Sequence, residues 1–148
     1  MKKLEARDLK DLNLLKHYRI IRKWACKNNG LTDSDLELLI YLDCIDLFTI
    51  QDFKMGSYSY SWENRRWNRL IQGDWVVVWR NRNRTNPKYN IYKFSFKGKP
   101  LIQRIYRIML GEDDIPTSER RNSIMKGNTY LDKVLQTSIH NVNQEKNR

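Results

Sequence analysis

The chain has few of the residues that build disulfide scaffolds, metal sites or membrane spans. Its 148 residues include two cysteines, two histidines, three prolines and six glycines. Cys26 and Cys44 are too few and too isolated for a disulfide framework. Two histidines suggest no metal-ligand cluster. No metal, cofactor or catalytic residue is therefore predicted.

Long apolar runs are also missing. No stretch approaches the roughly 20 apolar residues that cross a bilayer. Met1–Lys3 resembles the start of a signal peptide, but Glu5, Arg7 and Asp8 follow where an apolar segment would stand. We therefore expect an intracellular, cytoplasmic protein with no membrane partner.

Positive charge is plentiful and unevenly placed. Lys and Arg number 28 against 17 Asp and Glu, which gives a net charge of +11 and a pI of about 9.8. Counted by block, residues 1–30 carry +6, residues 31–55 carry −5, residues 56–100 carry +8 and residues 101–148 carry +2. This excess predicts an anionic partner, nucleic acid first. Adjacent blocks of opposite sign favour a folded domain over a basic tail.

Helical patterns flank the middle of the chain. Residues 9–29 predict a long first helix that Gly30 can end. It is apolar on more than one side, so it either lies in its own core or meets a second copy of the chain. Thr32 and Asp35 form a capping-box pattern before a core helix. Thr49 and Asp52 repeat that pattern before a short helix, which residues 55–57 are expected to break.

The C-terminal part predicts further helices. Pro100 suits the first turn of a helix that starts near residue 99. Residues 111–116 read as a loop and 117–127 as irregular, basic chain. A last helix is expected over about 129–142, with Thr129 and Asp132 as a capping box. Its apolar stripe is Leu131, Val134, Leu135, Ile139 and Val142. Residues 143–148 should fray.

The most informative stretch is residues 58–96. A helix over about 59–72, capped by Ser59 or Ser61, places Trp62, Trp67, Leu70 and Ile71 on one half. Polar and basic residues occupy the other half. Gly73 and Asp74 signal a turn, and the segments 75–79 and 90–96 read as strands. The predicted fold is mainly α with a small β-hairpin wing, a winged helix-turn-helix with flanking helices.

The polar half of this helix and the loop at 80–90 predict a surface for duplex DNA. Guanidinium, amide and hydroxyl groups hydrogen-bond base edges and phosphates. Arginines at 80, 82 and 84 would point to one side of an extended chain and repel each other unless an anion lies there. The predicted contact residues are Ser61, Asn64, Arg65, Arg66, Asn68, Arg69, Arg80, Arg82, Arg84 and Lys88.

The order of these elements resembles the MarR-type winged-helix transcription regulators over about residues 10–110. The resemblance rests on LTDSDLELLIYL, on RLIQGDWV before the wing and on KFSFKGKPLI, where Ser95 and Gly98 stand for the family's threonine and glycine. The length is that of one domain over residues 1–148, and the patterns divide it into an N-terminal helix at 9–29, the helix-turn-helix and wing at 32–96 and C-terminal helices at 99–142. The resemblance implies a homodimer joined through the first and last helices.

The chain departs from the family pattern at three positions. Asp74 stands where members usually have glycine, with Gly73 one place early. Glu63 replaces an apolar residue, and the wing has arginines but no aspartate. The pose on DNA is therefore expected to differ in detail.

Two other functions compete with DNA binding. The five tryptophans could anchor a protein partner in the transcription or replication machinery, as for a phage-encoded modulator; otherwise they form the core. An enzyme would need Asp33, Asp35, Glu37 and Asp43 as metal ligands, but helix caps and a solvated face account for them. The chain has no nucleophile with a base and no phosphate loop, so an enzyme is not expected.

Overall fold

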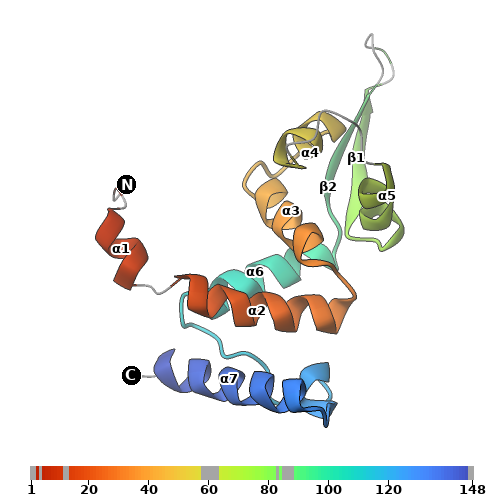
Figure 1. The fold of residues 1–148 in the computed structure, drawn as a ribbon. Helices are drawn as coiled ribbons and strands as arrows, with labels where there is room; N and C mark the ends of the chain where they lie inside the picture. Colours follow the sequence, from red (N-terminus) through yellow and green to blue (C-terminus); the bar gives the residue numbers. More distant parts are fainter. Residues whose placement is uncertain are drawn as a thin grey trace. The chain divides into compact units, whose positions relative to one another are not determined.

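The computed structural model describes residues 3, 5–11, 14–57, 64–82, 84 and 89–146. In chain order (Figure 1) its elements are α1 Ala6–Asp11, α2 Leu14–Asn29, α3 Asp33–Asp43, α4 Ile50–Ser57, α5 Asn64–Gln72, β1 Val76–Arg82, β2 Tyr89–Phe94, α6 Gly98–Met109, the 3₁₀ helix η1 Ser123–Lys126 and α7 Tyr130–Lys146. This is a mainly α fold with one antiparallel hairpin. Among these helices, none is long and apolar enough to cross a membrane.

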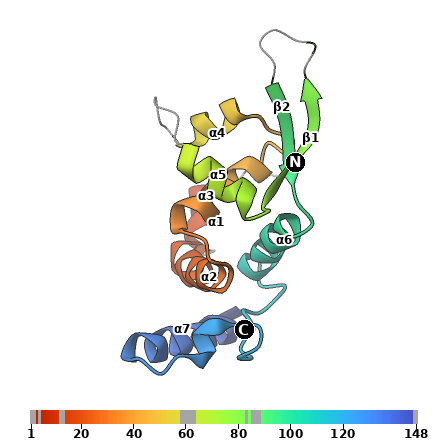
Figure 2. The same ribbon diagram turned by 90° about the vertical axis from the view of Figure 1, so that its right-hand side faces the viewer.

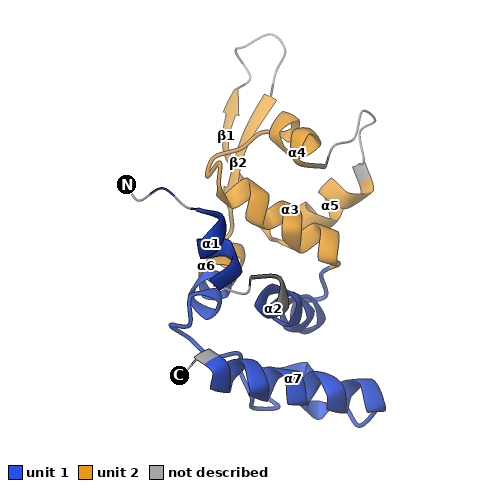
Figure 3. Cartoon of the chain, turned by 60° about the vertical axis from the view of Figure 1, so that its left-hand side comes forward, with its two compact units in different colours: residues 1–31, 104–148 blue, residues 32–103 orange. Residues whose placement is uncertain are grey.

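The chain divides into two compact units (Figure 3). Residues 1–31 and 104–148 form unit 1, and residues 32–103 form unit 2. Unit 2 holds the predicted helix-turn-helix and hairpin, and unit 1 holds the first and last helices. The single domain predicted over residues 1–148 stays a prediction.

In unit 1, α2 forms most of the predicted first helix. The helical segment begins at Ala6 rather than at residue 9, and residues 12 and 13 lie outside the described part. Gly30 ends α2 as predicted, because its φ of +67° turns the chain and lets the Leu31 N–H donate to Cys26 O at 3.1 Å. The buried residues of α2 include Ile21, Trp24 and Ala25. Neither Cys26 nor Cys44 forms a disulfide in the described part of the chain.

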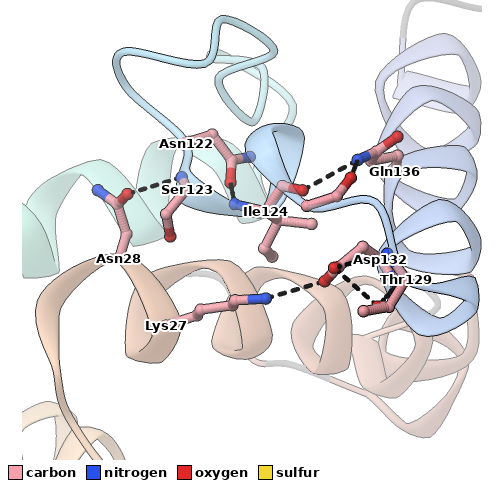
Figure 4. A network of polar contacts seen from close by, with 9 residues as sticks. Lys27, Asn28, Asn122, Ser123, Ile124, Thr129, Asp132 and Gln136 are labelled. Carbon is pink, nitrogen blue, oxygen red and sulfur yellow. Dashed lines mark hydrogen bonds and ion pairs between the residues drawn. The ribbon is translucent and has the colours of Figure 1, made fainter.

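Polar side chains link α2, η1 and α7 within unit 1 (Figure 4). The capping box before α7 is present, since Asp132 accepts from the Thr129 hydroxyl at 2.7 Å and donates its N–H to that oxygen at 3.1 Å. Lys27 Nζ donates to Asp132 at 3.0 Å. The Thr129 hydroxyl first, and then Lys27, lower the pKa of Asp132. Asn28 accepts from the Ser123 N–H at 3.1 Å, so η1 is fixed to α2.

Two predictions for the C-terminal part are wrong. Helix α7 continues to Lys146 instead of fraying after residue 142. The physical reason is Asn143, whose buried amide exchanges two hydrogen bonds with the Ile115 backbone, at 2.9 and 3.0 Å. The segment 117–127 is not irregular throughout, because Asn122 caps η1 by accepting from the Ile124 N–H at 3.0 Å.

In unit 2, α3 and α4 begin as predicted. Thr32 accepts from the Asp35 N–H at 3.1 Å, and Thr49 and Asp52 form a reciprocal box. The break expected at 55–57 is wrong, since α4 runs through Ser57. Gly56 lies against α3, where a Cβ would come within 2.5 Å of the Tyr41 ring. The glycine thus permits close helix packing rather than ending the helix.

The hairpin pairs Val76 with Phe94 and Arg82 with Tyr89, with an irregularity at Trp79. Phe48, just before α4, adds one further bridge to Tyr92, with N–H···O distances of 3.1 and 2.7 Å. The sequence did not predict this bridge. It joins the segment before α4 to the second hairpin strand, so that the helices and the hairpin share one core.

The second strand ends at Phe94, two residues earlier than predicted. Ser95 Oγ accepts from the Lys97 and Gly98 N–H groups at 3.2 and 3.0 Å, which turns the chain into α6. Phe96 lies beyond the end of this strand and is 99% exposed. Lys97 Nζ instead lies over the Trp75 ring, 4.0 Å from its centroid.

Candidate nucleic-acid interface

Helices α4 and α5 follow each other in the order of a helix-turn-helix, with residues 58–63 between them outside the described part, and the hairpin comes next. Figures 1 and 2 show α3, α4 and α5 grouped beside the base of the hairpin, which extends beyond them. The predicted start of the second helix, residues 59–63 with Ser61 and Glu63, lies outside the described residues. Described α5 begins at Asn64.

One side of α5 is anchored by aromatic packing. The Trp67 ring lies 5.1 Å from Phe53 and 4.9 Å from Tyr92, measured between centroids, and Leu70 is fully buried. Phe48 meets the edge of the same indole at 6.5 Å. At Trp67 and Leu70 this agrees with the predicted face, whereas Ile71 is exposed and Trp62 lies outside the described residues. A helix held on one side in this way presents its opposite side outward.

The outward side carries a mixture of cationic and amide groups. Arg65, Asn68 and Gln72 are exposed. These side chains supply guanidinium and amide donors together with amide acceptors, the groups that pair with base edges. The side chain of Asn64 lies outside the described part, so its predicted base contact stays a prediction.

Two of the predicted DNA-contact residues, Arg66 and Arg69, have a partner inside the protein. Arg69 Nη2 lies 3.1 and 3.3 Å from the two carboxylate oxygens of Asp35, and Arg66 Nε lies 3.7 Å from one of them. Asp35 is 3% exposed, whereas the Arg69 side chain is 53% exposed. The acidic segment therefore neutralises part of the basic helix, and Arg69 keeps an open edge. The sequence did not predict that Asp35 pairs with Arg69.

The turn after α5 adopts a conformation that suits glycine. Asp74, not Gly73, has the positive φ, at 62°. The Trp75 N–H donates to Leu70 O at 3.0 Å and the Asp74 N–H to Ile71 O at 3.0 Å, which closes the helix end. This is the position where the MarR-type pattern has glycine. The aspartate that replaces this glycine therefore adopts the left-handed backbone conformation itself.

The hairpin carries the remaining predicted residues. Arg80 and Arg82 are two apart on β1, so their side chains leave the same face of the ladder. Arg80 and Arg84 are exposed and Arg82 is half-buried. Arg84 follows the strand in a turn, so its predicted alignment with the other two stays a prediction. Lys88 and residues 83 and 85–87 lie outside the described part.

The structure thus places five of the predicted residues at open positions on α5 and the hairpin: Arg65, Asn68, Arg69, Arg80 and Arg84. In the described ranges no three His, Cys, Asp or Glu side chains gather as a metal site. Asp35 and Asp43, considered as metal ligands, are instead paired with Arg69 and Lys99. Lys99 lies 2.7 Å from Asp43, and that hydrogen bond raises the pKa of the lysine.

Comparison with known proteins finds likeness in structure only. No family model and no curated protein matches the chain. Two solved structures from E. coli are similar, wild-type MarR in its apo form and a cysteine-to-serine mutant of MarR. Each has 15% sequence identity and a TM-score of 0.48, covering 95% of this chain and 97% of the other.

Proposed function

We propose that the chain is a DNA-binding transcription regulator that docks α5 and the hairpin on a duplex. The observation that carries the proposal is the pair of faces on α5. Trp67 and Leu70 fix one face in the core, while Arg65 and Asn68 project from the other. A buried anchor with an open cationic and amide face is what reading a major groove requires.

Different residues would serve different parts of DNA recognition. Arg65, Asn64 and Asn68 would read base edges, since arginine pairs with guanine and asparagine with adenine. Arg80, Arg82, Arg84 and Lys88 would place the hairpin on the backbone or in the minor groove. Asp35 holds Arg69 at 3.1 Å, which leaves the exposed edge of that guanidinium for a phosphate. Ser61 and Arg66 complete the proposed contacts.

The proposed protein is a homodimer that reads a palindromic site. Support comes from the stripe on α7, whose first half is uncovered. Leu131 and Val134 are 58% and 42% exposed, although the same stripe is buried at Ile139 and Val142. An uncovered apolar stripe on a terminal helix fits contact with a second copy.

The test is selection of bound sequences from a random duplex pool, followed by affinity measurement against salt. With roughly 6–10 phosphate contacts, affinity should fall about 10³–10⁵-fold between about 50 and 200 mM salt. Arg65→Ala should relax the selected sequence, because a base contact is lost. Arg82→Ala should weaken binding to all duplexes alike and reduce the salt slope by about one.

Arg120→Ala provides the matched control, since Arg120 is exposed in unit 1 and far along the chain from α5 and the hairpin. It removes the same charge and should leave sequence preference unchanged. A shallow salt slope for the unaltered protein would refute DNA binding. Loss of preference in the Arg82 variant but not the Arg65 variant would reverse the proposed roles.

A second candidate function is docking to a protein of the transcription or replication machinery. Two exposed aromatic side chains favour it, Trp79 at the hairpin irregularity and Phe96 before α6. Trp24, Trp67 and Trp75 are buried and serve the core. This function would be favoured by a partner protein that co-purifies in a stoichiometric amount and is lost in the variant Trp79→Ala. The unaltered protein should then give no shift of duplex DNA in an electrophoretic mobility assay.

A further inference from the structure

Unit 1 contains a small polar hollow that the proposed DNA contacts do not use. It measures about 330 Å³ and is lined by residues 114–118 with Arg104 of α6, Arg121 and Asn143 of α7. All of these belong to unit 1. The hollow therefore lies within a single compact unit, apart from the residues of α5 and the hairpin.

The wall of this hollow is fixed by hydrogen bonds of its own. The Asn143 side chain accepts from the Ile115 N–H and donates to the Ile115 carbonyl oxygen. Asn122 Nδ2 donates to Pro116 O at 2.7 Å, and the Asn122 and Arg121 N–H groups both donate to Ser118 O, at 3.0 and 3.1 Å. Figure 4 shows Asn122 next to Ser123, which is tied to α2. A wall held this way is formed before any ligand arrives.

Arg104 carries a hydrogen-bond donor that has no acceptor among the described residues. Its Nε atom is buried and has no hydrogen-bond partner in the part of the chain that the structure describes. The guanidinium carbon lies 6.0 Å from the centroid of the Trp24 ring, whose own Nε1 is likewise buried without an acceptor. Arg107 on the same helix shows the satisfied alternative, donating from Nε to Asp113 at 2.8 Å. A buried donor without an acceptor is costly unless another group supplies one.

The remaining lining defines the chemistry of that group. Arg121 adds a second guanidinium, and Thr117 and Ser118 add hydroxyl donors. Asp114 is the one acidic residue of the lining, and no ion pair joins it to Arg104 or Arg121 in the described structure. Two arginines with hydroxyls suit the several acceptor oxygens of a carboxylate or phosphate.

We propose that this hollow binds a small free oxyanion, a carboxylate or a phosphate, between Arg104 and Arg121. The anion is held by charge-assisted hydrogen bonds to both guanidinium groups. The site is independent of DNA binding, so either proposal can fail alone.

The experiment follows the Nε–H resonance of Arg104 in the ¹⁵N-labelled full chain during titration. The signal is assigned by its absence in Arg104→Lys. Inorganic phosphate and malonate are added separately at constant ionic strength, which tells a phosphate site from a carboxylate site. We expect a saturable shift of this resonance with at least one of them, and none with chloride.

Three exposed positions sharpen the test without disturbing the core. Arg121→Gln should weaken binding by about tenfold or more, because a charge-assisted contact is lost. Arg120→Gln removes a neighbouring charge that does not line the hollow and should leave the affinity unchanged. Asp114→Asn should strengthen binding severalfold by removing the one negative charge. The proposal is overturned if neither anion gives a saturable shift, if the two arginine variants behave alike, or if the resonance responds to duplex DNA only.

Discussion

At the scale of single residues, the role of a charged side chain in this protein depends on the groups that surround it more than on its residue type. Asp35 is buried and accepts from Arg69, while Arg65 on the same helix stays exposed. Arg104 and Arg107 lie one turn apart on α6, yet only Arg107 has a carboxylate at 2.8 Å. Neighbouring arginines on one helix thus serve different purposes, which sequence alone does not distinguish.

Asp74 offers a direct test of local backbone strain. Its φ of 62° costs an L-residue free energy that glycine avoids, and a negative charge at a helix C-terminus opposes the dipole. Asp74→Gly should therefore raise the free energy of unfolding by about 1 kcal/mol, measured by urea denaturation with an unchanged m-value. Asp74→Ala removes the charge but keeps the Cβ, so it should raise the free energy of unfolding by less than Asp74→Gly. Equal stability of the two variants would contradict the assignment of strain.

At the scale of elements, caps and close contacts decide where helices begin and end. Thr129 and Asp132 start α7, and Lys27 ties that cap to α2 at 3.0 Å. Asn143 carries α7 past its predicted end by holding Ile115. Gly56, which was expected to end α4, lies inside this helix. A Cβ at this position would come within 2.5 Å of the Tyr41 ring, so glycine suits the close packing of α4 on α3.

The cap of α7 makes stability depend on pH in a defined direction. The pKa of Asp132 is lower in the folded chain than in the unfolded chain, mainly through the Thr129 hydroxyl and Lys27. Its contribution is therefore present above the unfolded pKa and is lost as pH falls through the folded one. Between about pH 6 and pH 3, the unaltered protein should lose more stability than Asp132→Asn, as urea unfolding at each pH will measure.

Glu119→Gln provides the reference for that comparison. Glu119 is exposed and has no described partner, so this variant should follow the unaltered protein at every pH. Parallel curves for the unaltered protein and Asp132→Asn would refute the stabilising role of the ionised cap.

At the scale of the whole molecule, the net charge of +11 supports the proposed DNA partner, and the uncovered stripe on α7 supports the proposed homodimer. We expect a dimer in sedimentation experiments. Leu131 and Val134 lie three residues apart and so share one side of α7. The double variant Leu131→Lys, Val134→Lys should be monomeric with unchanged helix content, because two buried lysines would be too costly at the interface.

The control for dimerisation is Gln144→Lys, an exposed position of α7 outside the stripe. It adds charge to the same helix and should remain dimeric. A monomeric unaltered protein, or a double variant that stays dimeric, would rule out this interface.

The sequence by itself determined the order of the main helices and the hairpin, the caps at Thr32, Thr49 and Thr129, and the burial of Trp67 and Leu70 on α5. These follow from local periodicity and from hydrogen bonds that span three or four residues. Only the tertiary structure decided that Asp35 holds Arg69, that Phe48 pairs with Tyr92, that Phe96 is exposed and that Asn143 extends α7. Each of these depends on residues distant in the chain, and no local pattern records which distant partner a side chain meets.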